Sequence, residues 1–185
     1  MRKILVVVGS GVENGNTDRL ADAFVKGAQE AGHEVKKVFL DKGDLHGCRG
    51  CGFCQLQEPN VTKCAINDVM QEVYPIYEQC DTVVMASPLY FWTLSSQIKA
   101  FMDRLYAVSR KDIYPHKDSI LLMTAGDDSP NTFEKPLAYY TFITEALGSK
   151  VLGTYTAGGC SGKPGHHTIS EEHLQGAYEM GLNLK

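Results

Sequence analysis

The fold of this 185-residue chain is decided by residues 81–92, Asp81-Thr82-Val83-Val84-Met85-Ala86-Ser87-Pro88-Leu89-Tyr90-Phe91-Trp92. Residues 81–86 form a run typical of a parallel strand that is buried on both faces. Three successive aromatic residues then stand in the loop before a helix-like stretch over residues 94–106. Such loops usually carry polar or small residues, so these aromatics indicate a surface that stacks against a flat, partly apolar ligand. The alternative is that they only close the top of the core.

The rest of the chain alternates strand-like and helix-like patterns. Strands are expected over residues 3–8, 33–40, 81–86, 119–125 and 150–155, several of them as continuous apolar runs. Helices are expected over residues 17–31, 68–79, 94–106, 132–147 and 171–182. Gly32 and Gly148 stand where two of these helices should end. The alternation predicts a parallel, doubly wound sheet with right-handed crossovers, in a single domain over residues 1–185.

The composition is that of an ordinary globular protein. The chain is 43% hydrophobic and 22% charged, and its net charge is −4. No cluster of lysine and arginine indicates a nucleic-acid surface. No apolar run approaches the roughly 20 residues of a membrane helix, and residues 4–8 are too few for a signal peptide. We therefore expect a cytoplasmic protein with no nucleic-acid or membrane partner, in which six cysteines serve metal binding, redox chemistry or burial.

The first predicted strand leads into a loop of small and hydroxyl residues, Gly9-Ser10-Gly11-Val12-Glu13-Asn14-Gly15-Asn16-Thr17. Open backbone N–H groups, side-chain donors and a helix start are what a phosphate needs. Neither the P-loop nor the dinucleotide pattern of glycines is present. The alternative is a plain helix cap, with Asn16 as the N-cap residue. Position favours a phosphate, because the loops after the first and third strands flank the ligand crevice of a doubly wound sheet.

Two motifs are specific in combination. The first is Gly9-Ser10 followed by Asn14-Gly15-Asn16-Thr17. The second is Ser87-Pro88-Leu89-Tyr90-Phe91 running into Gln97-Ile98-Lys99-Ala100-Phe101-Met102-Asp103-Arg104. Together they resemble the flavodoxin-like NAD(P)H-dependent FMN reductase family, over nearly the whole chain. The resemblance implies a flavodoxin-like three-layer α/β sandwich with a five-stranded parallel sheet of order 2-1-3-4-5, non-covalently bound FMN, and commonly a homodimer whose partner helps to close the flavin site.

The resemblance also implies which residues contact FMN. The phosphate would be held by Ser10, Asn16 and Thr17. The isoalloxazine ring would be lined by Pro88, Leu89, Tyr90, Phe91 and Trp92. A third segment, less closely matched, contributes Thr124 and Gly126. Gly11 departs from the family pattern, in which many members have proline and then a basic residue. No catalytic side chain is expected, because hydride acceptance and electron delivery belong to the flavin.

A second unusual feature is the cysteine group Cys48, Cys51, Cys54 and Cys64, between the second strand and the second helix. The two-residue gaps resemble ferredoxin-type ligation more than a zinc site. Iron-sulfur flavoproteins, relatives in the same family, carry a 4Fe-4S cluster here, but their fourth cysteine usually follows sooner than the gap over residues 55–63 allows. Thiols without metal are therefore favoured over a cluster, and zinc comes third.

Other residues receive structural roles or none. Lys99 and Asp103 are expected to form a surface ion pair, and Arg104 a structural contact. Cys80 and Cys160 are expected to be small buried hydrophobes. Residues 158–165 are expected to form a surface loop without chemistry of its own, and His166 and His167 to be merely solvent-exposed. His46, two residues before Cys48, is a candidate for influencing a thiolate or the edge of a cluster.

Three functions are compatible with these observations. The favoured one is an FMN-dependent oxidoreductase that takes a hydride from NAD(P)H and reduces a quinone, flavin or other small acceptor. The second is an electron carrier of the iron-sulfur flavoprotein type, with FMN and a 4Fe-4S cluster. The third is a flavodoxin-like interaction scaffold that binds no flavin.

Overall fold

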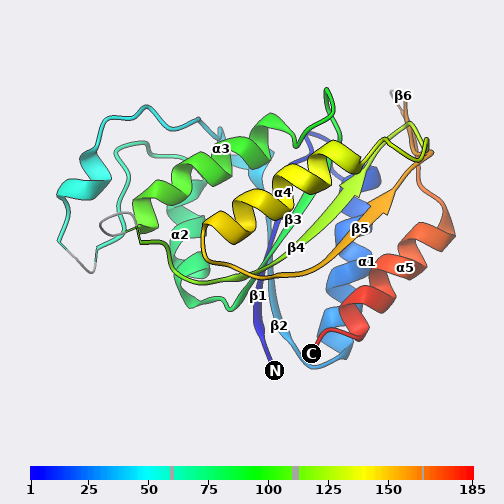
Figure 1. Cartoon of the computed structure of the whole chain (residues 1–185), viewed down its shortest axis with the longest axis horizontal. Helices are drawn as coiled ribbons and strands as arrows, with labels where there is room; N and C mark the ends of the chain where they lie inside the picture. Colours follow the sequence, from blue (N-terminus) through cyan, green and yellow to red (C-terminus); the bar gives the residue numbers. More distant parts are fainter. Residues whose placement is uncertain (59–60, 110–112, 164) are drawn as a thin grey trace.

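The computed structural model describes residues 1–58, 61–109, 113–163 and 165–185. At the centre of this described part is a sheet of five parallel strands (Figure 1): β1 (Lys3–Val8), β2 (Glu34–Phe39), β3 (Thr82–Pro88), β4 (Asp118–Thr124) and β5 (Val151–Ala157). Their order is β2-β1-β3-β4-β5. The predicted flavodoxin-like sheet is confirmed, and its switch point lies between β1 and β3.

Helices cover both faces of the sheet. One face carries α1 (Asn16–Glu30) and α5 (Glu171–Leu182), and the other carries α2 (Met70–Gln79), α3 (Ser96–Arg104) and α4 (Glu134–Ala146) (Figure 1). Short 3-10 helices lie in the connections: η1 (Leu40–Gly43), η2 (Phe53–Leu56) and η3 (Leu105–Val108). In the described ranges, no helix has both the length and the apolar character needed to cross a membrane.

The strand β1 shows why the sheet is covered on both faces. Leu5 and Val7 belong to the apolar cluster under α2, α3 and α4, whereas Ile4, Val6 and Val8 belong to the cluster under α1 and α5. All five side chains are buried, because successive residues of a strand point to opposite faces. A continuous apolar run is therefore the signature of a central parallel strand.

The helix ends follow from local contacts, and one prediction about them is wrong. Asn16 is not the N-cap of α1: Gly15 occupies that position in extended conformation, and Asn16 is the first helical residue. Gly32 and Gly148 follow the ends of α1 and α4 with φ of 85° and 71°, the left-handed region that favours glycine. The second helix begins at Met70, two residues later than predicted, because Asp68 Oδ1 accepts a hydrogen bond from Met70 N over 3.1 Å.

Residues 158–165 are not the featureless loop expected from the sequence. After a short bend they form β6 (Ser161–Lys163), which pairs antiparallel with β7 (His166–Thr168); Pro164 lies outside the described residues. Cys160 N donates to Ala125 O over 2.9 Å, so the segment is tied to the loop that follows β4. Three-residue strands without apolar alternation leave no periodic signal in the sequence. We call residues 158–163 and 165–168 the β6–β7 hairpin.

Candidate functional site

A cavity of about 350 Å³ lies at the carboxyl ends of β1, β3 and β4, beside the switch point of the sheet. Its lining comes from the loops after these three strands and from the β6–β7 hairpin: Ser10, Val12, Gly15, Asn16, Thr17, Pro88, Leu89, Tyr90, Thr124, Ala125, Gly126, Cys160, Gly162 and His167. The volume lies in the range of small-molecule sites. Every predicted cofactor residue except Phe91 and Trp92 is in this lining.

The first loop presents a helix start to the cavity. Because the N-cap is Gly15, the opening turn of α1 has no side-chain cap. The backbone N–H groups of a first turn have no acceptor inside their helix, and the helix dipole adds positive charge there. Ser10 shapes the loop, since its Oγ accepts from Val12 N over 3.1 Å. The arrangement suits a phosphate.

Asn16 supplies an independent sign of a missing ligand. The residue is only 9% exposed and lines the cavity. Its Nδ2 donates to Ser161 O over 2.6 Å, but its buried Oδ1 has no hydrogen-bond partner among the described residues. A buried polar atom left unpaired costs about 1–3 kcal/mol, so it marks a place where a ligand donor belongs. FMN carries both a phosphate for the helix start and ribityl hydroxyls that can donate, so the residues present fit this cofactor.

The loop after β3 is a tight turn with a rigid base. Leu89 N donates to Thr124 O over 2.8 Å, and Tyr90 and Thr93 exchange two backbone hydrogen bonds of 3.1 Å. Between them Phe91 and Trp92 have φ of 46° and 58°, a left-handed conformation that non-glycine residues seldom adopt. Such residues cost about 1–3 kcal/mol each and are concentrated at functional sites.

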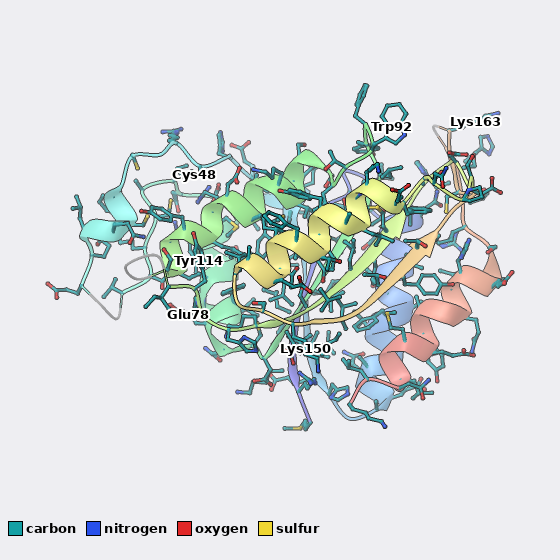
Figure 2. The ribbon with its side chains drawn as sticks, viewed as in Figure 1. Cys48, Glu78, Trp92, Tyr114, Lys150 and Lys163 are labelled. Atoms are coloured by element: carbon teal, nitrogen blue, oxygen red, sulfur yellow. The ribbon has the colours of Figure 1, made fainter. Side chains whose placement is uncertain are left out.

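This turn separates the predicted aromatics into two groups. Tyr90 lines the cavity, together with Pro88 and Leu89. Phe91 is 93% exposed and Trp92 is 69% exposed, and Figure 2 shows Trp92 standing away from the body of the protein. Neither of these two side chains lies in the cavity wall. Of the five residues predicted to line the isoalloxazine ring, Pro88, Leu89 and Tyr90 are therefore the three in the wall of the cavity.

The junction of β1 and α3 depends on Gly9. A Cβ at this position would lie 2.6 Å from Ser95 Oγ and closer still to Ile98 Cγ1. Ser95 is the N-cap of α3, and its Oγ accepts from Ile98 N over 3.3 Å. Ser95 N in turn donates to Ser87 Oγ over 2.9 Å. Because Gly9 has no side chain, the loop over residues 9–17 can pack closely against the start of α3 and the turn over residues 89–93 that precedes it.

The sequence assigned no role to the β6–β7 hairpin, yet Cys160, Gly162 and His167 line the cavity. The signal that could have found them is topological. The hairpin follows β5, and the carboxyl ends of all parallel strands meet at one edge of the sheet. Residues after the fifth strand are therefore candidates for the same crevice, even without a motif.

The cysteine group does not form a ligand set in this structure. Cys48 and Cys51 are exposed, whereas Cys54 and Cys64 are half-buried. Within the described ranges, no group of three or more histidine, cysteine, aspartate or glutamate side chains is arranged to hold a metal ion. The thiols as placed do not fit a 4Fe-4S cluster.

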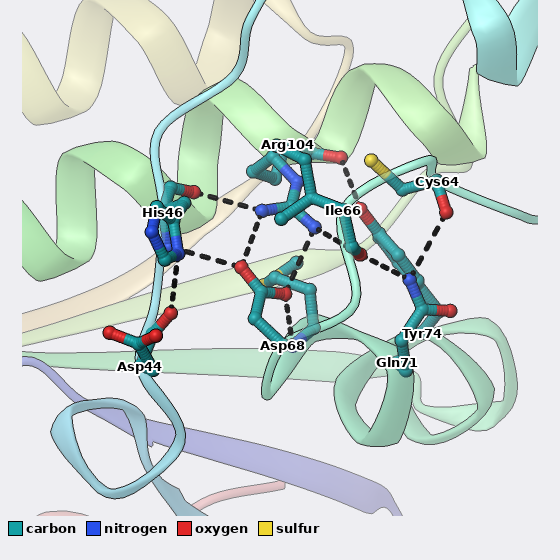
Figure 3. A network of polar contacts seen from close by, with 9 residues as sticks. Asp44, His46, Cys64, Ile66, Asp68, Gln71, Tyr74 and Arg104 are labelled. Carbon is teal, nitrogen blue, oxygen red and sulfur yellow. Dashed lines mark hydrogen bonds and ion pairs between the residues drawn. The ribbon is translucent and has the colours of Figure 1, made fainter.

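The guanidinium of Arg104 binds both ends of the segment that carries Cys48 to Cys64 (Figure 3). Arg104 makes a two-pronged ion pair with Asp68, with Nη1–Oδ2 at 2.7 Å and Nη2–Oδ1 at 3.0 Å, and both side chains are almost fully buried. Arg104 also donates to His46 O over 2.8 Å and to Ile66 O over 3.4 Å. His46 precedes Cys48 and Ile66 follows Cys64 by two residues each. The predicted structural role of Arg104 is confirmed.

The charge states in this network follow from its contacts. Burial alone raises the pKa of the Asp68 carboxyl, but hydrogen bonds from Arg104, His46 N and Met70 N outweigh it and lower the pKa. Burial opposes the charge of Arg104, but its bonds to Asp68 raise the guanidinium pKa. His46 takes part through its backbone, while its exposed ring lies 2.7 Å from Asp44 O.

The predictions for Lys99, Asp103, Cys80 and Cys160 are confirmed. Lys99 Nζ lies 2.6 Å from Asp103 Oδ1 on the exposed side of α3, as an i, i+4 pair. Cys80 and Cys160 are 4% and 7% exposed. Burial raises the pKa of the Cys80 thiol to about 11 and also raises the pKa of Cys160. Both are therefore neutral thiols near neutral pH. The prediction that His166 and His167 are merely solvent-exposed is wrong for His167, which is half-buried and lines the cavity.

The strand order of the sheet and the cavity at its switch point define a flavodoxin-like class of protein. Residues 2–132 match the NADPH-dependent FMN reductase family, and the chain belongs to this family. Its members are NAD(P)H-dependent FMN oxidoreductases, so the protein is a flavoprotein enzyme with FMN as its cofactor. The family expected from the two sequence motifs is confirmed.

Several curated relatives of the chain are named iron-sulfur flavoproteins. An iron-sulfur flavoprotein of Archaeoglobus fulgidus is 28% identical over 183 residues, which are 98% of this chain and 78% of that protein. Iron-sulfur flavoproteins of Methanosarcina thermophila and Methanocaldococcus jannaschii are each 31% identical, over 110 and 102 residues, which are 56% and 51% of those proteins.

Solved structures share the fold. The chain is similar to an NAD(P)H:quinone oxidoreductase from Methanothermobacter marburgensis, with 16% identity, a TM-score of 0.76 and coverage of 100% and 99% of the two chains. It is also similar to an FMN-dependent NADH-azoreductase from Bacillus anthracis in complex with FMN, with 14% identity, a TM-score of 0.68 and coverage of 98% and 96%.

Proposed function

We propose that FMN binds in the cavity beside the switch point and that the enzyme passes electrons from NAD(P)H to a small acceptor such as a quinone. The observation that carries the site is that the two motif loops and Asn16, with its unpaired Oδ1, meet in one cavity. Quinone is proposed as the acceptor because the structurally similar archaeal protein is named an NAD(P)H:quinone oxidoreductase.

Each loop has a distinct task in this proposal. Ser10 and Thr17 hold the phosphate end with the first-turn amides of α1, and Asn16, beside them, accepts a hydrogen bond from a ribityl hydroxyl on its unpaired Oδ1. Pro88, Leu89 and Tyr90 lie along the ring, in a turn fixed by the bond from Leu89 N to Thr124 O. FMN, when bound, supplies the chemistry of accepting a hydride and returning two electrons. The protein contributes binding, orientation and the exclusion of water.

Three measurements test this function: the absorption spectrum of the protein, reduction of the flavin by NADH or NADPH, and transfer of its electrons to a quinone. The purified protein should show flavin absorbance, and released flavin should be FMN at about one per chain. NADH or NADPH should bleach this absorbance anaerobically, and a soluble quinone should restore it while quinol forms. A protein that binds no flavin after incubation with excess FMN would contradict the proposal.

A matched pair of variants tests the site itself. Asn16→Leu removes the unpaired Oδ1 and also breaks the hydrogen bond from Nδ2 to Ser161 O. Both losses should weaken FMN binding. Asn131→Leu is the control, since Asn131 is exposed and outside the cavity. Equal FMN affinity in both variants would place the flavin elsewhere.

We also propose that the enzyme is a homodimer. Phe91, Trp92 and Phe142 are large apolar side chains that are 93%, 69% and 70% exposed, and burial against a second chain would remove them from water. Light scattering of the eluting protein should give twice the chain mass. The variant Phe91→Ser with Trp92→Ser should shift this mass toward the monomer, and an unchanged mass would argue against a role of the turn in assembly.

A second candidate is the electron carrier of the iron-sulfur flavoprotein type. The names of the curated relatives and the spacing of Cys48, Cys51 and Cys54 favour it, whereas the arrangement of the thiols in this structure does not. Iron and acid-labile sulfide, assayed on anaerobically purified protein, decide between the two. About four irons per chain would support the carrier.

A further inference from the structure

We infer that His167, carried by the β6–β7 hairpin, is the cationic partner of the FMN phosphate and makes the site select FMN over riboflavin. This inference rests on the proposed flavin site. It assigns a binding role to a residue that lies 151 positions beyond Asn16, the first residue of the helix it serves.

The first argument is the charge inventory of the cavity. The loop over residues 9–17 contains no lysine, arginine or histidine, and its one charged side chain, Glu13, is paired with Lys42. Among the described lining residues, His167 has the only basic side chain. A phosphate at the start of α1 therefore has partial positive charge from the helix, but a full counter-charge only from His167.

The second argument is the register of the hairpin. Ser161 pairs with Thr168, and Gly162 pairs with His167. Because Asn16 Nδ2 donates to Ser161 O over 2.6 Å, the hairpin is tied to the first turn of α1 at the pair next to His167. The imidazole is thus carried to the phosphate end of the cavity rather than to the ring end.

The third argument is the difference between the two adjacent histidines. Successive strand residues point to opposite sides of a hairpin. His166 is exposed, whereas His167 is half-buried and lines the cavity. Its cross-strand partner Gly162 also lines the cavity and has nothing within 4 Å of where a Cβ would lie. The space beside the imidazole is open to a ligand group.

The hairpin is held firmly enough to position a side chain. Cys160 N donates to Ala125 O over 2.9 Å, and the ring of His173 on α5 makes a 3.2 Å contact from Nε2 to Gly158 O. At the other end, Ser170 caps α5 by accepting from His173 N over 3.2 Å. Of the neighbouring acidic groups, Asp18 in the first turn of α1 is paired with Lys37 at 2.8 Å, and Asp128, which lies against Gly158 and Gly159, is outside the cavity lining.

Titration of the whole apoprotein with FMN and with riboflavin, followed by flavin fluorescence, tests the inference. Riboflavin has the same ring and ribityl chain without the phosphate, so it is an internal control for the cavity. His167→Ala should weaken FMN binding about 10- to 100-fold, as expected for loss of a hydrogen bond to a charged group, and leave riboflavin binding within about twofold. His167→Lys should restore most of the FMN preference. His166→Ala, the matched control one residue away, should change neither affinity.

The outcomes separate this inference from the proposed function. Unchanged FMN affinity in His167→Ala overturns the role of His167 and leaves the flavin site intact. An equal loss of FMN and riboflavin binding also overturns it, because the residue would then shape the cavity rather than recognise the phosphate. A wild-type protein that binds neither flavin contradicts the proposed function itself.

Discussion

Replacing Arg104 by methionine should destabilise the protein far more than an exposed substitution would. The side chain is 1% exposed and the Asp68 side chain 0%, so the variant leaves a buried carboxylate without its counter-ion. It also leaves His46 O and Ile66 O without this donor. Breaking a buried ion pair on one side costs about 3–5 kcal/mol, a large share of the roughly 5–15 kcal/mol that stabilises a typical protein of one domain.

The double variant Arg104→Met with Asp68→Leu separates the ion pair from the general cost of mutation. Because both charges are then gone, it should recover the part of the loss that comes from the unpaired carboxylate, although His46 O and Ile66 O still lack this donor. Urea unfolding of the apoproteins measures the three free energies of unfolding, with no contribution from bound flavin. Lys99→Met, at an exposed ion pair on the same helix, should cost less than about 1 kcal/mol.

The same pair makes a prediction about pH. The folded-state pKa of Asp68 lies below its ordinary value of 3.8, so its contribution is fully present above that pH and is lost as pH falls through the folded-state pKa. Below about pH 4 the wild type should lose stability faster than the double variant. A cost of Arg104→Met below about 1 kcal/mol, or parallel pH profiles, would refute the buried-pair reasoning.

Three further predictions follow from single contacts. Gly9→Ala should destabilise the protein by about 1–3 kcal/mol and weaken FMN binding, because the added Cβ has no room at the base of the aromatic turn; unchanged unfolding in urea would contradict this. Thr17→Val should cost about 1–3 kcal/mol, because Thr124 Oγ1 loses its buried partner at 2.7 Å, and calorimetry of the apoprotein would show it. At pH 8 a thiol reagent should label exposed Cys48 within minutes but Cys80 only after unfolding, because burial raises the pKa of Cys80 to about 11; mass spectrometry of peptides locates the label.

The sheet and the two motif loops could be predicted because their signals are local. The central strands are continuous apolar runs that only a doubly covered sheet explains, and their order follows the family resemblance. The convergence of Ser10, Asn16 and Thr17 with Pro88, Leu89 and Tyr90 then follows from topology, since both loops leave the same edge of the sheet.

The direction of the aromatic side chains could not be predicted. Phe91 and Trp92 leave the cavity because their backbone is left-handed, and nothing in a Tyr-Phe-Trp sequence indicates a conformation that bulky residues disfavour. The β6–β7 hairpin could not be predicted either, because its sequence carries too weak a signal. Its strands are too short and too polar for a periodic signal, so His166 and His167 looked equivalent until register separated them.

The helix α3 shows how local and distant information combine in one element. The Lys99–Asp103 pair was visible from its spacing, whereas Arg104, the next residue, pairs with Asp68 across 36 positions that no spacing rule connects. The amino end of α3 is capped by Ser95, which is bonded to Ser87 below the aromatic turn. Its carboxyl end holds the cysteine segment through Arg104. One nine-residue helix therefore fixes the turn beside the cavity relative to the segment that carries Cys48 to Cys64. A substitution at Arg104 should therefore make the segment that carries Cys48 to Cys64 more mobile. The start of α1, which lines the cavity, should stay in place.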